Sequence, residues 1–75
     1  MMNKNFTEIN EKLRKEIIRL RLEKKMTKKE FSEKTGFSYS KIRNIENNGI
    51  VSILDLFYIA EVFDTYPSQI FKNID

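Results

Sequence analysis

Helix-capping residues and glycines alternate at short intervals through the middle of this chain. Thr27, Ser38 and Ser52 each stand where a helix is expected to begin, and Gly36 and Gly49 each stand where one is expected to end. A capping hydroxyl accepts a backbone amide of the first turn, and glycine readily adopts the left-handed conformation that closes a helix. The chain is therefore expected to fold into several short helices.

A longer helix is expected before this region, from near Thr7 to near Lys25. Its apolar residues recur every third or fourth position, as one buried helix face requires: Ile9, Leu13, Ile17 and Leu20. The basic residues near its end suit the negative end of the helix dipole.

The second helix is predicted to begin at Thr27 and to stop at Gly36. Thr27 and Glu30 have the T-x-x-E form of a capping box, in which each side chain accepts the other residue's amide. Met26 precedes the cap and is expected to pack against Phe31 as a hydrophobic staple.

The third helix is predicted from Ser38 to about Asn47 and is closed by Gly49. Its apolar face holds Ile42 and Ile45 only. The second and third helices, joined by a tight turn, have the outline of a helix-turn-helix.

Two more helices are expected in the last third of the chain. Ser52 and Asp55 suggest a second capping box, and Pro67 suits the first position of a short helix ending at Ile70 and Phe71. The fold class predicted is an all-α, compact five-helix bundle, one domain over residues 1–75 with an ordered core at about 7–72. The buried stripe predicted for the fourth helix is Ile53, Leu56, Phe57, Ala60 and Phe63.

Composition excludes several classes of function. The chain has no cysteine and no histidine, so it lacks thiolate ligands, the commonest metal ligand and the commonest general base. It also has no cluster of carboxylates, and we expect no enzyme activity, cofactor or metal site. No segment resembles a signal peptide or a membrane span, which predicts a cytoplasmic protein with no membrane partner.

Charge is distributed unevenly along the chain. Residues 1–49 carry 13 Lys/Arg against 7 Asp/Glu, whereas residues 50–75 carry 1 Lys against 4 Asp/Glu. A basic half suits a surface that faces phosphates, although a solvated charged face has the same composition.

The third predicted helix has an outer face rich in hydrogen-bonding side chains. Its serine, tyrosine, asparagine and basic residues can all bond base edges or phosphates. No carboxylate interrupts this face before Glu46. The residues are Ser38, Tyr39, Ser40, Lys41, Arg43, Asn44 and Asn47.

The segment MTKKEFSEKTGFSYSKIRNIENN resembles the helix-turn-helix of phage Cro and repressor proteins, the xenobiotic-response-element family of bacterial regulators. The resemblance extends from about Leu13 to Phe71. It implies a lambda-repressor-like fold that binds double-stranded DNA.

The resemblance also implies roles for two basic residues. Arg21 matches an arginine that pairs with a glutamate at the position of Glu46 and that lies near a phosphate. Lys28 matches a residue that contacts phosphate at the start of the second helix. The alternatives are that Arg21 and Glu46 are unrelated surface charges, and that Lys28 is merely solvated.

Residues of the third helix match family positions that enter the major groove. Asn44 is the expected reader of adenine, through N6 and N7. Tyr39 is expected to touch a thymine methyl or a phosphate, unless it packs on Phe37. The base readers implied are Ser38, Tyr39, Ser40, Arg43 and Asn44, and the phosphate contacts are Arg21, Lys28, Lys41, Asn47 and Asn48.

The sequence departs from the family pattern at three places. Ser32 replaces the usual alanine where the second and third helices meet, and its hydroxyl is expected to bond back to its own helix. The loop that follows the third helix is about a residue short, with Val51 where proline is common. Asp64 stands where glycine is usual, a position that aspartate tolerates.

The last third of the chain has more large apolar side chains than a small core is expected to bury. An apolar patch left exposed often marks an interface, and family members commonly dimerise through this region. An aromatic-rich core in a monomer is the alternative. The expected homodimer interface is Ile50, Val51, Phe57, Tyr58, Tyr66, Ile70 and Phe71.

The function predicted is sequence-specific regulation of transcription, with repression at a palindromic operator bound by a homodimer. The same fold serves as the controller protein of a restriction-modification system or as an antitoxin, and both remain alternatives. A protein-interaction module that has lost DNA binding would carry a neutral or acidic third helix, unlike this one. The chain leaves no room for an effector domain, so no small-molecule ligand is expected.

Overall fold

The computed structural model describes residues 6–49 and 51–75, and all regular structure within them is helical. The prediction of an all-α fold with five helices is confirmed. Ile50, one of the expected interface residues, lies outside the described residues. The helices are α1 (Phe6–Glu23), α2 (Lys28–Thr35), α3 (Tyr39–Asn48), α4 (Ile53–Val62) and α5 (Pro67–Ile74).

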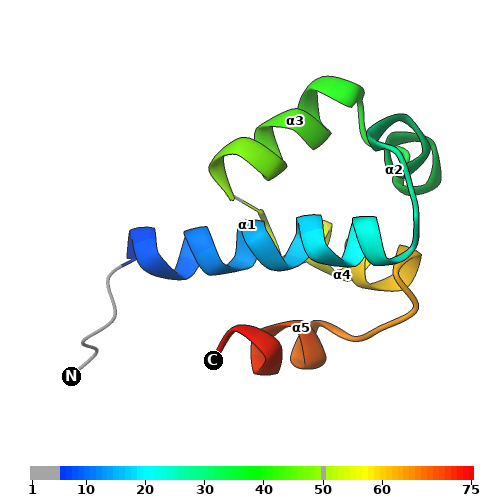
Figure 1. Cartoon of the computed structure of the whole chain (residues 1–75). Helices are drawn as coiled ribbons and strands as arrows, with labels where there is room; N and C mark the ends of the chain where they lie inside the picture. The colour runs from blue at the N-terminus through cyan, green and yellow to red at the C-terminus, as the bar shows by residue number, and fades with distance from the viewer. Residues whose placement is uncertain (1–5, 50) are drawn as a thin grey trace.

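The long helix α1 organises the fold. Figure 1 shows α3 on one side of α1 and α5 on the other, and α1 contacts both. Helix α2 packs against α3 and α4, and α4 packs against α5. Helix α3 therefore rests on the rest of the molecule by one face and leaves the opposite face open.

The core is formed by apolar side chains from all five helices and from the connections between them. Phe31 of α2 stacks on Phe63, which follows α4, with ring centroids 5.0 Å apart and an angle of 30° between the rings. Offset stacking of this kind adds to the gain from burying the two rings. The buried apolar residues are Leu13, Ile17, Leu20, Met26, Phe31, Ile42, Ile45, Leu56, Ile59, Ala60, Phe63 and Ile70.

The start of α2 has the capping box predicted from the sequence. The Glu30 amide donates to Thr27 Oγ1 at 3.0 Å, and the Thr27 amide donates to Glu30 Oε1 at 2.9 Å. The bond from the Thr27 backbone lowers the pKa of Glu30. Met26 and Phe31, the expected staple, are both buried in the core.

Gly36 and Gly49 close α2 and α3 in the left-handed conformation, with φ of 79° and 72°. The two sites differ in their surroundings. A Cβ at Gly36 would meet no atom within 4 Å, whereas a Cβ at Gly49 would overlap the carbonyl oxygen of Asn10 and lie 3.1 Å from Arg14 Cβ. The end of α3 thus passes so close to α1 that only glycine fits.

Two turns also use the left-handed region without glycine. Lys25 has φ of 55° in the turn that follows α1, and the helix ends at Glu23, two residues before Lys25, near which its end was predicted. Asp64 has φ of 56° in the turn before α5, which is the conformation that its position in the sequence suggested.

The predicted buried stripe of α4 is partly wrong. Leu56, Ala60 and Phe63 are buried as predicted, but Ile53 and Phe57 are 69% and 56% exposed. Ile59, which was not part of the predicted stripe, is buried in the core. The reason is that α4 is apolar nearly all round, so its periodicity does not tell which face the chain covers.

A polar contact joins α1 to α5. Glu16 is largely buried and accepts from Arg19 on its own helix, at 2.9 and 2.7 Å, and from Asn73 of α5 at 2.9 Å. The Arg19 guanidinium, followed by the Asn73 amide, lowers the pKa of Glu16 although burial opposes the shift.

Candidate nucleic-acid interface

The outer face of α3 is polar and exposed. At about 100° per residue, the face opposite the buried Ile42 and Ile45 carries side chains that all project to solvent. They are Ser40, Arg43, Asn44 and Asn47. Tyr39 flanks this face on one edge, and Lys41 and Asn48 flank it on the other.

The single carboxylate of α3 does not belong to this face. Glu46 is only 3% exposed and points toward α1. Its Oε2 accepts from Arg21 Nε at 2.7 Å and its Oε1 from Arg21 Nη2 at 3.2 Å. Burial of Glu46 leaves the outer face of α3 without a negative charge.

Arg21 and Glu46 thus form the pair that the family resemblance implied. The remaining Nη1 of Arg21 donates to the Met26 carbonyl at 2.8 Å, just before the cap of α2. Arg21 therefore joins α1, α2 and α3. With its guanidinium largely buried and three of its five N–H groups bonded within the chain, Arg21 has a structural role. Its expected contact with a phosphate stays a prediction.

A second arginine, which was not predicted from the sequence, also holds α3. Arg14 Nη1 donates to the Glu46 carbonyl at 3.1 Å, which satisfies one of the free carbonyls at the end of α3. Arg14 precedes Arg21 by seven positions, so the two lie on the same face of α1. This spacing of seven residues is the feature of the sequence that could have indicated a contact between Arg14 and α3.

The turn between α2 and α3 is fixed by two hydroxyl side chains. Ser32 Oγ donates to the Phe37 carbonyl across the turn, and not back to its own helix as expected. Thr35 Oγ1 donates to the Phe31 carbonyl at 2.8 Å and accepts from the Phe37 amide at 3.2 Å. These bonds set the angle at which α3 leaves α2.

Ser38 caps α3 and is also exposed. Its Oγ accepts the Lys41 amide at 3.1 Å, and a hydroxyl that accepts one bond keeps its own hydrogen to donate. Ser38 is thus able to cap the helix and to bond a DNA acceptor at the same time.

Asn44 and Asn48 contact each other on the surface of α3. Asn48 Nδ2 donates to Asn44 Oδ1 at 2.6 Å. An amide oxygen has two lone pairs, so Asn44 retains one acceptor position and both amide hydrogens. The contact is compatible with bidentate bonding of Asn44 to adenine and fixes which way its amide points.

The residues expected to contact phosphates differ in their solvent exposure and in their partners within the chain. Lys28 is half-buried at the first position of α2, and Asn47 and Asn48 are exposed. Lys41 instead pairs with Asp55 of α4, at 3.0 Å, and lies over the ring of Phe37, 4.3 Å from its centre. Asp55 therefore contacts Lys41, while Ser52 caps α4 through the Asp55 amide.

The expected interface residues separate into buried and exposed groups. Ile70 is fully buried in the core, so its assignment to a surface is wrong, and Val51 is half-buried against the core. Phe57, Tyr58, Tyr66 and Phe71 are exposed, as an interface requires, although Phe57 was also predicted to belong to the buried stripe of α4. Ile53 and Leu54 of α4, which were not among the expected interface residues, are exposed as well.

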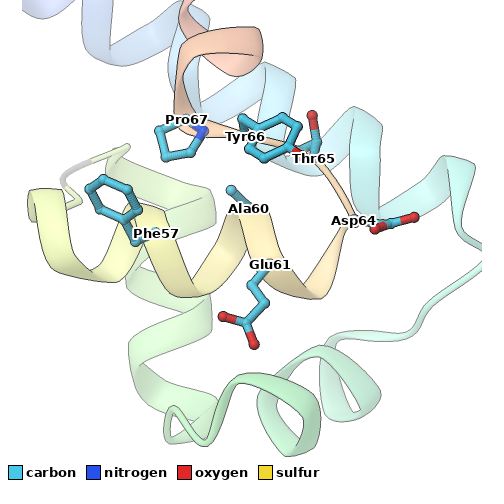
Figure 2. Close-up of a pocket in the computed structure, with 7 residues that line it drawn as sticks. All are labelled: Phe57, Ala60, Glu61, Asp64, Thr65, Tyr66 and Pro67. Atoms are coloured by element: carbon cyan, nitrogen blue, oxygen red, sulfur yellow. The ribbon is translucent and has the colours of Figure 1, made fainter.

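Phe57 and Tyr66 lie on opposite sides of a groove between α4 and the turn that leads to α5 (Figure 2). The groove has a volume of about 340 Å³ and is lined by Phe57, Ala60, Glu61, Asp64, Thr65, Tyr66 and Pro67. It extends the exposed apolar face of α4 toward α5.

A family model described as helix-turn-helix matches residues 17–70, which includes α2, the turn and α3 in full. The chain belongs to this family, the helix-turn-helix of the Cro/C1, xenobiotic-response-element type. It is a DNA-binding transcriptional regulator of that type, and the family is not typically enzymatic. Searches of curated proteins and of solved structures gave no significant match.

Two further findings concern residues 6–49 and 51–75 alone. They contain no group of three or more acidic, cysteine or histidine side chains placed to hold a metal ion. None of their helices combines the length and the apolar character that crossing a membrane requires.

Proposed function

We propose that residues 1–75 act as one DNA-binding domain, which represses transcription by binding a palindromic operator as a homodimer. Helix α3 enters the major groove. The base readers are Ser38, Tyr39, Ser40, Arg43 and Asn44, and the phosphate contacts are Arg21, Lys28, Asn47 and Asn48.

The observation that carries this proposal is the inward position of Glu46. Because that carboxylate is buried against Arg21, the outer face of α3 offers only neutral polar groups and the positive charge of Arg43. An exposed carboxylate at this place would repel phosphates on both sides of the groove. The face is therefore suited to a polyanion with hydrogen-bonding groups on its base edges.

Asn44 is the proposed reader with the most specific geometry. An asparagine amide accepts from adenine N6 and donates to adenine N7 in the same plane, a pairing that distinguishes adenine from the other bases. Asn48 holds the Asn44 amide in one orientation, which reduces the freedom lost on binding.

The homodimer is supported by the exposed apolar face of α4. Ile53, Leu54, Phe57 and Tyr58 lie on one side of this helix, opposite the core. A second copy on this face would leave both α3 helices free to bind half-sites about one helical turn apart, roughly 34–36 Å. A dimer with two-fold symmetry requires an operator of matching symmetry.

The test is selection of binding sites from random duplex DNA at about 50 and about 200 mM salt. We expect a palindromic motif to emerge at both concentrations. Binding that is governed only by salt, with no motif selected, would contradict the proposal of sequence-specific readout.

Two substitutions then separate readout from phosphate contact. Asn44→Ala should relax preference at one base position in each half-site, at a cost of about 1–3 kcal/mol. Lys28→Ala should weaken binding to all sequences alike. It should also reduce the salt slope, which is the steepness with which the logarithm of the binding constant falls with the logarithm of the salt concentration, by about 0.9. If Asn44→Ala lowered the affinity for every duplex equally, Asn44 would be a backbone contact and not a reader.

A further inference from the structure

Lys41 is held on two sides although it belongs to the helix proposed to enter the groove. Its Nζ lies 3.0 Å from Asp55 Oδ2 and 4.3 Å from the centre of the Phe37 ring. The Lys41 side chain is 44% exposed and that of Asp55 is 18% exposed. The cation is therefore directed toward α4, away from the outer face of α3.

The groups that hold Lys41 are themselves fixed. Asp55 is in the first turn of α4, where its amide donates to Ser52 Oγ at 3.1 Å and where a negative side chain is favoured by the helix dipole. Phe37 packs edge-on against Tyr58 of α4, with ring centroids 6.3 Å apart and an interplanar angle of 86°. Lys41 thus occupies a site formed by Asp55 of α4 and by Phe37, which packs against α4.

We propose that Asp55 is a positioning residue that withholds Lys41 from the DNA backbone and so lowers the sequence-independent part of the affinity. Each cation that neutralises a phosphate releases counterions and adds affinity for any sequence. Lys41 contributes little of this, because a phosphate that approached its ammonium would also approach the Asp55 carboxylate. The proposal rests on the entry of α3 into the major groove.

This arrangement leaves Arg43 as the cation on the outer face of α3. Removal of the Asp55 charge frees a second cation on the edge of the same helix, within reach of the backbone that borders the groove. The expected gain is one phosphate contact, shared by all sequences, and it leaves the ratio between operator and random duplex unchanged.

The test compares wild type with Asp55→Asn, Lys41→Gln and the double variant, using random duplex and the selected operator over a range of salt concentrations. Asp55→Asn should steepen the salt slope by about 0.9, which at 0.1 M salt is up to about eightfold tighter binding. Lys41→Gln alone should leave the slope unchanged. The double variant has the wild-type net charge and should lose the gain.

Asp64→Asn is the matched control, since it removes one carboxylate outside the pair and asparagine tolerates the left-handed conformation of Asp64. If Asp64→Asn increased the salt slope and the affinity for DNA as much as Asp55→Asn does, the effect would be due to net charge alone. That result would overturn the proposal. A flatter slope in Lys41→Gln alone would also overturn it, because Lys41 would then already contact phosphate. Failure of the proposed base readout by α3 would be seen in a different experiment, since Asn44→Ala would then leave the base preference unchanged.

Discussion

Glu46 has two effects that depend on a single orientation of its side chain. Turned inward, it satisfies the buried guanidinium of Arg21 and, through that contact, joins α3 to α1 and to the start of α2. The same orientation removes a negative charge from the outer face of α3. The stability of the fold and the electrostatics of the proposed interface therefore depend on one residue.

Glu46→Ala should cost about 3–5 kcal/mol of unfolding free energy, because it leaves the Arg21 cation buried without its partner. Glu23→Ala is the matched control: it breaks the exposed Arg19–Glu23 pair, which should contribute no more than about 1 kcal/mol. Urea unfolding of the two variants measures the difference. Equal losses would mean that the Arg21–Glu46 pair is solvated in solution.

The end of α3 and the middle of α1 depend on each other at the level of elements. Arg14 bonds the Glu46 carbonyl, and one turn later Gly49 passes against the Asn10 carbonyl and Arg14 Cβ. Displacement of this contact would change how α3 lies on α1. The angle of the helix proposed to read DNA is thus set partly by a glycine outside it.

Gly49→Ala should therefore destabilise the fold more than Gly36→Ala. Both substitutions place a Cβ in the left-handed region, at about 1–2 kcal/mol, but only Gly49→Ala adds overlap with α1, at about 1–3 kcal/mol more. Thermal unfolding of the two variants under identical conditions gives the comparison. A Gly36→Ala variant as unstable as Gly49→Ala would argue against close packing of this loop on α1.

The elements were predictable where the signal is local. Thr27, Glu30 and Gly36 specify the bounds of α2 through contacts within a few residues, and the structure has those contacts. Asp55 was expected to complete a capping box, but its carboxylate pairs with Lys41, fourteen positions earlier. A local pattern carries no information about a partner that only the folded chain brings near.

The same limit applied to the surface of the molecule. Helix α4 is apolar on nearly every side, so the sequence predicted an excess of apolar surface without telling that Ile53 and Leu54 belong to it and Ile70 does not. The Arg21–Glu46 pair was expected from the family resemblance alone. The pairing of residues that are distant in the sequence depends on tertiary packing, and hydrophobic periodicity carries no information about that packing.

Taken as a whole, the molecule places its positive charge and most of its large exposed apolar side chains in different parts of the chain. Residues 1–49, which contain α3, carry the net positive charge, and residues 50–75 are net negative and contain the exposed face of α4. An acidic segment is unsuited to contact phosphates. This division supports a second copy, and not DNA, as the occupant of the α4 face.

Phe57→Lys should convert a dimer into a monomer of 9.0 kDa, measured by sedimentation equilibrium at tens of micromolar protein. Phe57 is already 56% exposed within one chain, so the charge would be buried only in the dimer, where an unpaired cation is costly. Leu22→Lys is the matched control, since Leu22 is 60% exposed on α1 and does not belong to the proposed interface, so that this substitution should leave the mass unchanged. A wild-type mass of 9.0 kDa, or loss of the dimer in the control, would contradict this interface.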